Sequence, residues 1–413
     1  MRTTIEIHNP GAFDFRSLRA ETDLLYRRVA DRDRAVLAIG VHHIVQEPEF
    51  NSEGHVKDWV FGVLPYEWEG GVDARSHGQP ELAAKDPARW FVPQLVVEWV
   101  GELVRLHALQ GKEEQAGIWT RSLFLTTPAD QADAPIDWTE GSSRTDYLAN
   151  AQQLLAHIQR GDIYEVNYCT ARSATASTFD PFSAFNRMLD RSQAPFAAFY
   201  RNRDSYALCA SPERFLAFHG SKVMGQPMKG TRPRSADPQE DLRLAQELAH
   251  DGKERSENIM ALDVMRNDLS RVAASGSVKV DELCAVVSFP KVHQMISTVS
   301  ARLREGSTPL DAIRAAFPMA SMTGAPKIRA MQLIHAAEEG PRGLYSGSLG
   351  FFAPDGTADF NVVIRSVFFN DRTKLLSMWT GSAITAQCRP EDEWDECQLK
   401  ARSVIDALRH ELA

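Results

Sequence analysis

The sequence has few of the features that mark secreted or membrane-bound proteins. It holds five cysteines, an odd number without CxxC spacing, and this argues against a disulfide framework or a cysteine zinc site. The histidines are not arranged at zinc spacing either. The N-terminus lacks the basic-then-apolar layout of a signal peptide. The most apolar region, Trp90 to Val104, is interrupted by Pro93 and contains Glu98, so it cannot span a membrane. We therefore expect a soluble, cytoplasmic protein.

The chain also lacks the marks of a nucleic-acid or nucleotide partner. Its formal net charge is -9, and the sequence contains no dense cluster of lysine and arginine residues. No GxGxxG or phosphate-loop motif is present. What remains is an ordinary globular composition, 43% hydrophobic and 24% charged, in 413 residues that can bury a large core.

Periodicity and composition predict a mixture of strands and helices without the strict alternation of a doubly wound sheet. The expected strands are Ala35–Val41, Trp59–Leu64, Tyr206–Ala210, Arg214–Phe218, Leu349–Phe352, Asn361–Phe369 and Leu375–Trp379. The expected helices are Tyr147–Arg160, Pro238–His250, Glu254–Arg271, Pro309–Phe317, Pro326–Glu338 and Glu391–Leu412. Long loops are predicted at Gly70–Pro80 and Thr126–Gly141. The second divides an N-terminal part, residues 1–140, from a motif-dense part, residues 141–413.

Two pairs of glutamates have a spacing that suits a metal site. Glu254 and Glu257 are three residues apart at the start of one predicted helix, and Glu393 and Glu396 repeat this spacing in another. Lys400 follows Glu396 by four residues on the same stripe. Acidic residues at helix starts also complement the helix dipole, so either pair alone has a structural explanation. Together, four carboxylates could bind Mg²⁺ through oxygen.

Two further residues are candidates for chemistry. Lys229 adjoins a glycine between two prolines, where a stiff turn could present a nucleophile or a carboxylate anchor, although most such lysines face water. Glu213 precedes an apolar strand, where burial would raise its pKa as a general acid requires. A salt bridge from Glu213 to Arg214 or to another basic residue is the alternative.

Several long motifs, in order from about Arg144 to the C-terminus, resemble the chorismate-utilising enzymes, the family of anthranilate, aminodeoxychorismate, isochorismate and salicylate synthases. The motifs are GDIYEVN (161–167), SPERF (211–215), PMKGTRPR (227–234), ERSENIMALDVMRND (254–268), GAPKIRAM (324–331), PRGLYSGSLG (341–350) and EDEWDECQLKA (391–401). The resemblance implies an α+β fold of the anthranilate synthase component I type: one large domain with an antiparallel β-sandwich core flanked by helices.

The resemblance also implies roles for individual residues. Glu257 and Glu396 match the magnesium ligands, and Glu254 and Glu393 match neighbours that support the metal waters. The implied substrate-binding residues are Gly230, Thr231, Tyr345, Arg365, Gly381 and Lys400. A guanidinium such as Arg365 suits the enolpyruvyl carboxylate of chorismate. His293 matches a histidine near the ring, and Glu213 matches the acid that assists departure of the 4-hydroxyl group.

Two positions distinguish branches of the family. Relatives that activate water have a lysine where this chain has Glu165, so the resemblance favours ammonia as the nucleophile. Lys229 matches the PIKGT lysine of aminodeoxychorismate synthases, which attacks C2 of chorismate before ammonia enters at C4. This implies synthesis of 4-amino-4-deoxychorismate for 4-aminobenzoate and folate. The alternatives are the anthranilate synthase component I reaction of tryptophan biosynthesis and a non-catalytic chorismate-binding subunit.

Ammonia would come from a second protein. None of the five cysteines lies in a glycine-flanked motif such as GxCxG, so this chain is not expected to hydrolyse glutamine. The resemblance implies a separate glutamine amidotransferase subunit that forms a heterodimer with it. From the charge and the apolar pattern, no nucleic-acid or membrane partner is expected.

Overall fold

The computed structural model describes residues 2–8, 13–29, 33–68, 88–123 and 135–409. The predicted loop Gly70–Pro80 lies outside these residues, as does most of Thr126–Gly141. No helix in the described ranges is long and apolar enough to cross a membrane.

The described strands pair antiparallel throughout, in two branches that diverge from one long strand, β5 (Arg89–Val100). The first branch continues in order through β3 (Arg34–Val45), β2 (Asp23–Val29), β9 (Ala198–Asn202), β10 (Ser205–Cys209), β19 (Ser366–Asn370), β20 (Leu375–Thr385) and β8 (Glu165–Thr175). The second runs through β4 (Val60–Leu64), β17 (Ser348–Phe352), β18 (Thr357–Asn361), β11 (Arg214–His219), β12 (Lys222–Gly225) and β15 (Val292–Arg302).

Further strands complete the sheet. Strand β15 also pairs with β13 (Met228–Pro233) and β14 (Lys279–Ser288). The remaining strands are β1 (Arg2–His8), β6 (Leu103–Leu109), β7 (Thr139–Glu140) and β16 (Gly324–Ala325). Strands from both sides of residue 140 share the sheet, since β2 pairs with β9 and β4 with β17.

The two branches enclose a hydrophobic core. Leu25 and Val36 of the first branch and Phe61, Val63 and Leu349 of the second belong to one buried cluster. All five residues of β4 are buried, as expected of a strand covered on both faces. This arrangement confirms the antiparallel β-sandwich that the family resemblance implied.

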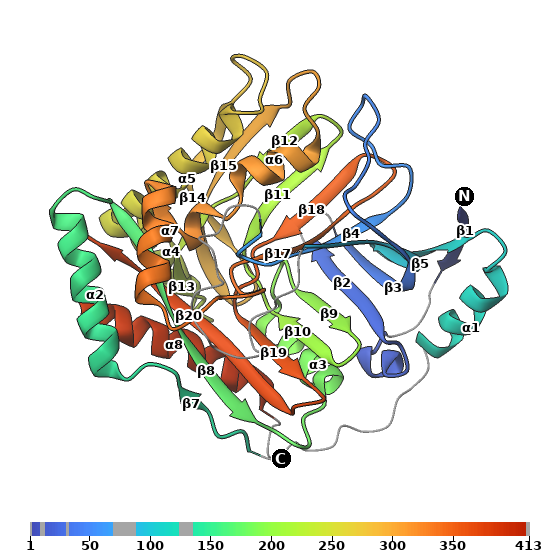
Figure 1. Ribbon diagram of the computed structural model, residues 1–413, viewed down its shortest axis with the longest axis horizontal. Coiled ribbons are helices and arrows are strands. Elements are labelled where there is room, and N and C mark those ends of the chain that lie inside the picture. Colours follow the sequence, from blue (N-terminus) through green and yellow to red (C-terminus); the bar gives the residue numbers. More distant parts are fainter. Residues whose placement is uncertain (1, 9–12, 30–32, 69–87, 124–134, 410–413) are drawn as a thin grey trace.

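Helices cover the outer faces, and Figure 1 shows most of them gathered on one side. Helices α2 (Arg144–Gln159), α7 (Lys327–Ala337) and α8 (Pro390–Leu408) share a core cluster with β8 and β20. Helices α4 (Pro238–His250) and α5 (Gly252–Ser270) pack on β13, β14 and β15. The other helices are α1 (Glu113–Leu123), α3 (Pro181–Ser192), α6 (Pro309–Ala316) and the 3-10 turns η1 (Phe15–Leu18) and η4 (Ala320–Met322).

Most elements expected from the sequence are present, but one prediction is wrong. Asn361–Phe369 was expected to be a single strand, whereas it forms the end of β18, a break at residues 362–365 and the start of β19. Arg365 lies at this break with φ of 52°, a left-handed conformation that a strand cannot contain. Its apolar neighbours gave a strand-like pattern because they are buried on both sides of the break.

Candidate active site

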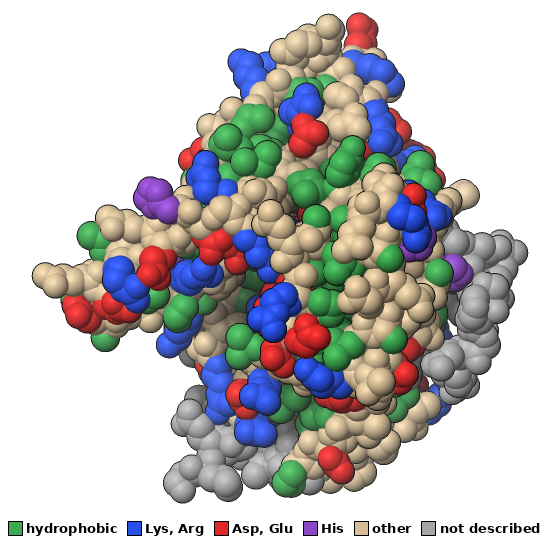
Figure 2. Space-filling view, turned by 90° about the vertical axis from the view of Figure 1, so that its left-hand side faces the viewer, with side chains coloured by type: hydrophobic (Ala, Val, Ile, Leu, Met, Phe, Trp, Pro, Cys, Tyr) green, Lys and Arg blue, Asp and Glu red, His purple; other side chains and the backbone are tan. Residues whose placement is uncertain are grey.

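A cavity of about 840 Å³ opens among β13, β20 and the N-terminal turns of α5 and α8. Twelve of the thirteen predicted site residues line it. They are Glu213, Lys229, Gly230, Thr231, Glu254, Glu257, Tyr345, Arg365, Gly381, Glu393, Glu396 and Lys400. His293 is the exception. Figure 2 shows the face that carries the clustered helices, where acidic and basic side chains stand close together. The volume suits a small-molecule ligand.

The two glutamate pairs reach the cavity because both helices begin beside it. Asp251 caps α5, and its side chain accepts hydrogen bonds from the backbone N–H groups of Lys253 and Glu254. Glu254 therefore lies in the first turn of α5, and Glu257 follows one turn later on the same face. In α8, Pro390 occupies the first turn together with Glu393, and Glu396 follows one turn on.

Burial and neighbouring charges give the four carboxyl groups different acidities. Burial raises the pKa of Glu257 to about 7, with Lys229 opposing the rise and Glu165 adding to it. Burial also raises the pKa of Glu254 and of Glu393. In Glu396 the effect of burial is outweighed by Lys400, whose ammonium lies 2.6 Å from the Glu396 carboxylate and lowers its pKa.

The donor set fits a hard divalent cation such as Mg²⁺. All four side chains offer carboxylate oxygens to one cavity, and the Oε1 atom of Glu257 is buried without a hydrogen-bond partner. In the arrangement shown, however, no three acidic, histidine or cysteine side chains of the described residues converge closely enough to hold a metal ion.

Lys229 is a buried amine held between acids. Its Nζ donates a hydrogen bond of 2.9 Å to Oε1 of Glu165 and lies 3.7 Å from Oε2 of Glu257. Burial alone would lower the pKa of Lys229, but Glu165, Glu257 and Glu213 together raise it above its ordinary value. The amine is therefore an ammonium in this arrangement, and Glu165 is the group in contact that can accept its proton.

Glu213 has the properties of a general acid. Its side chain is 4% exposed, and Oε1 accepts a 2.7 Å hydrogen bond from the Ser321 hydroxyl. Burial raises the pKa of Glu213 to about 7, against the opposing influences of Ser321 and Lys229. Arg214, which the sequence offered as an alternative partner of Glu213, binds Asp359 through its Nε atom at 2.8 Å.

At two glycines the absence of a side chain leaves the backbone accessible along the cavity wall. Gly230 has φ of 83°, and a Cβ atom there would approach Leu248 Cδ1 to 2.9 Å and Glu254 to 3.1 Å. At Gly381 a Cβ atom would lie only 2.3 Å from Cys169 Sγ. Both positions therefore require glycine. Thr231 follows Gly230 in β13, opposite Gln294 of β15.

Cationic and aromatic side chains also line the cavity. The Arg365 guanidinium donates to Ser403 Oγ at 2.6 Å, and Lys400 Nζ donates to the Gly381 carbonyl at 2.7 Å. The ring of Tyr345 stacks on Trp379 with centroids 6.2 Å apart. Burial raises the pKa of Tyr345, so its hydroxyl stays neutral and can donate a hydrogen bond. A guanidinium and a phenol together can bind a carboxylate.

His293 does not line the cavity. Its Nδ1 atom lies 2.8 Å from Ser288 Oγ, and its Nε2 atom lies 2.9 Å from Asp241 Oδ1 on α4. The next residue of β15, Gln294, lines the cavity instead, since successive side chains of a strand point to opposite faces. Gln294 is 3% exposed, and its Oε1 atom has no hydrogen-bond partner.

Sequence reasoning missed two side chains of this site. Gln294 could have been predicted from strand alternation. It directly follows the candidate residue His293, so its side chain lies on the other face of β15. Lys253 could have been found from helix spacing, because it precedes Glu257 by four residues and therefore shares its stripe. The pattern of paired glutamates does not itself include this lysine.

The chain is similar in sequence to several known proteins. The chain is 44% identical to an aminodeoxychorismate synthase of Streptomyces griseus over 85% of this chain and 50% of that protein. It is 39% identical to aminodeoxychorismate synthase component 1 of Salmonella typhimurium, over 70% of this chain and 62% of that protein. The chain is 37% identical to anthranilate synthase component 1 of Thermus thermophilus, over 68% of this chain and 60% of that protein. The chain thus spans about half to two thirds of the length of these relatives.

The fold has a counterpart among solved structures. The menaquinone-specific isochorismate synthase MenF of Escherichia coli superposes with a TM-score of 0.80, over 99% of this chain and 95% of that chain, at 18% identity. At such low identity the likeness concerns the fold. The model of the chorismate binding enzyme family matches residues 21–406, a range that includes all the cavity residues described above. The chain therefore belongs to the chorismate binding enzyme family.

Proposed function

We propose that this chain aminates chorismate at C4 with ammonia and forms 4-amino-4-deoxychorismate. The observation that carries the proposal is the placement of Lys229, a buried amine in contact with the carboxylate of Glu165, in the same cavity as Glu213, a buried acid whose pKa is raised to about 7. A nucleophile, a base that activates it and an acid for the leaving group are the parts that this substitution needs.

The residues suggest how the bonds change. Lys229 transfers a proton to Glu165, and the neutral amine attacks C2 of chorismate. Both ring double bonds shift, C1=C2 to C1=C6 and C5=C6 to C4=C5, the C4–O bond breaks, and the hydroxyl leaves as water with a proton from Glu213. Ammonia then forms a bond to C4, both double bonds shift back and the C2–N bond to Lys229 breaks. Glu213 regains a proton from the new ammonium group, and Glu165 returns its proton to Lys229. Chorismate and ammonia thus give the 4-amino compound and water, and Lys229 is regenerated.

The proposed metal is Mg²⁺, held by Glu257 and Glu396, with Glu254 and Glu393 accepting hydrogen bonds from its waters. The unpartnered oxygen of Glu257 supports this assignment. When bound, the ion would neutralise the carboxylate on the ring of chorismate. Arg365 and Tyr345 would hold the enolpyruvyl carboxylate.

The proposed ammonia source is a separate glutamine amidotransferase. Curated relatives named component 1 support the existence of a second component. The product, by its chemistry, would lead to 4-aminobenzoate and folate. The second candidate function is anthranilate synthesis, favoured by the 37% identity to the Thermus thermophilus protein.

Replacement of the lysine tests the proposal. With chorismate, Mg²⁺ and ammonium, Lys229→Ala should lower the rate of C4 amination at least about a hundredfold, because the nucleophile is lost. Chromatography separates the non-aromatic 4-amino product from fluorescent anthranilate. Undiminished amination would refute the covalent role of Lys229. Anthranilate as the wild-type product would favour the second candidate, and chorismate binding without turnover would favour a non-catalytic subunit.

A further inference from the structure

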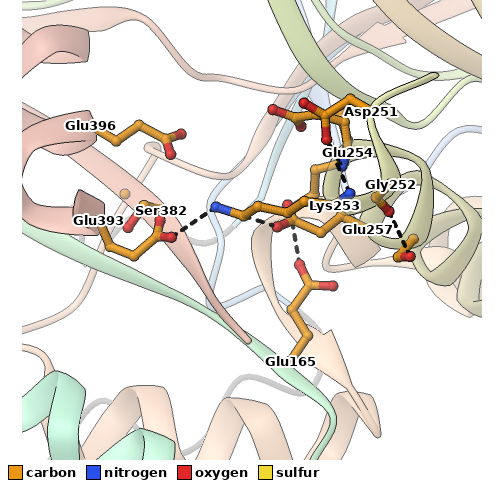
Figure 3. A network of polar contacts seen from close by, with 12 residues as sticks. Glu165, Asp251, Gly252, Lys253, Glu254, Glu257, Ser382, Glu393 and Glu396 are labelled. Carbon is orange, nitrogen blue, oxygen red and sulfur yellow. Dashed lines mark hydrogen bonds and ion pairs between the residues drawn. The ribbon is translucent and has the colours of Figure 1, made fainter. Parts of the chain in front are cut away.

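Lys253 places a positive charge inside the group of four glutamates. Its Nζ atom donates a hydrogen bond of 2.9 Å to Oε1 of Glu393 and lies 3.9 Å from Oε1 of Glu257. Figure 3 shows its side chain extending from α5 toward the acid on α8. The lysine therefore links carboxylates that come from two different helices.

The acids that Lys253 contacts are far more buried than the lysine itself. The side chains of Glu393 and Glu257 are 2% and 8% exposed, whereas that of Lys253 is 48% exposed. The lysine thus reaches them from the solvent side. Buried carboxylates that face one another repel unless a cation lies among them. In this structure the Lys253 ammonium supplies that charge beside Glu393, while Lys229 lies beside Glu257 and Lys400 beside Glu396.

The position of Lys253 conflicts with a divalent ion in the same place. The Glu257 oxygen nearest to its ammonium is the one without a hydrogen-bond partner. No three acidic side chains of the described residues converge enough to hold a metal in this arrangement. A divalent ion bound to this oxygen of Glu257 would lie close to the Lys253 ammonium. Two cations only a few ångströms apart repel each other strongly.

We propose that Lys253 is a tethered cation that fills the acid group when no metal is bound and must withdraw before the divalent ion enters. The inference rests on the metal site of the proposed function. Withdrawal is possible because the side chain is half exposed and flexible, so its charge can return to water. The lysine therefore stabilises the metal-free protein and weakens its affinity for the ion.

The substitution Lys253→Met tests this, because it keeps the hydrophobic stem and removes the charge. Titration calorimetry of the whole chain with MgCl2, without chorismate, should show Mg²⁺ binding about tenfold tighter than in the wild type. With a chelator present, the variant should melt at a lower temperature than the wild type, and saturating MgCl2 should abolish the difference. Recovery of the melting temperature also shows that the variant folds.

Lys374→Met is the matched control. Lys374 is 41% exposed and pairs with Asp371 at 2.5 Å, on a turn outside the cavity lining, so its replacement should leave Mg²⁺ affinity unchanged. Unchanged or weaker Mg²⁺ binding by Lys253→Met would overturn the inference while leaving the metal site intact. If neither protein binds Mg²⁺, the inference fails together with the metal of the proposed function, and turnover of chorismate with ammonium then tests the rest of that function separately.

Discussion

Glu213 illustrates how one buried side chain links catalysis to stability. Its pKa rises from 4.5 to about 7 through burial, so the folded protein keeps a proton that the unfolded chain releases. Between these values the folded state binds more protons, and the free energy of unfolding therefore falls as the pH rises from 4.5 through about 7. Glu213 is thus still partly protonated near neutral pH. At higher pH its buried carboxyl group ionises, and the folded protein loses stability.

The variant Glu213→Gln should separate the effect of Glu213 on stability from its proposed effect on catalysis. At about pH 8 it should raise the free energy of unfolding by up to about 3 kcal/mol, because no buried charge remains. It should also lower kcat by about a hundredfold or more, because the proton donor is lost. Urea unfolding near pH 4 and pH 8 measures the first effect. An equal change in stability at both pH values would contradict the assigned ionisation.

Gln294 and His293 allow a comparison between adjacent residues on opposite faces of β15. The unpartnered amide oxygen of Gln294 borders the cavity, whereas His293 joins Asp241 to Ser288. Gln294→Leu should lower kcat/KM for chorismate by about tenfold through one lost hydrogen bond, with little loss of stability. His293→Ala should instead lower the free energy of unfolding by about 1 to 3 kcal/mol. A larger loss of kcat/KM in His293→Ala would restore the histidine as the ring neighbour.

At the scale of elements, local signals explain why helices such as α4 and α6 could be predicted, whereas α1 and α3 were not among the expected helices. Asp237 caps α4 before Pro238, and Thr308 caps α6 with Asp311 in a capping box. These signals depend on residues close together in the chain. The break between β18 and β19 has no such signal. Val362 and Val363 are fully buried and strand-like in type, and only their tertiary surroundings interrupt the strand.

That break gives Arg365 its position, and a substitution tests whether the position serves binding. A non-glycine residue with φ of 52° costs about 1 to 3 kcal/mol and tends to occur at functional sites. Arg365→Ala should raise KM for chorismate about tenfold to a hundredfold by removing a charged hydrogen-bond donor. Arg203 has a similar φ of 54° and is exposed outside the cavity lining, so Arg203→Ala should leave KM unchanged. Equal KM values for both variants would refute the role of Arg365.

At the scale of the whole molecule, the sheet depends on pairs that are distant in the sequence. Strand β10 pairs with β19, joining Ser205 to Asn370, and β8 pairs with β20 over eleven residues of each strand. No periodicity within either strand identifies its partner, so the resemblance to known proteins had to supply the sandwich. The same limit applies to the cavity. The spacing of Lys253, Glu254 and Glu257 is local, but the arrival of Glu393 beside Lys253 is a property of the assembled fold.

The whole chain should use ammonia but not glutamine. Glutamine hydrolysis by a cysteine needs an accessible thiolate with a lowered pKa. Four of the five cysteines are buried, and Cys388 is half-buried. Burial raises the pKa of Cys169, Cys209, Cys388 and Cys397. The purified chain should therefore aminate chorismate with ammonium salts, increasingly as the pH rises and frees ammonia, and should use glutamine only after a glutamine amidotransferase is added. Amination from glutamine by the chain alone, checked by the release of glutamate, would place the ammonia source within this molecule and remove the need for a second subunit.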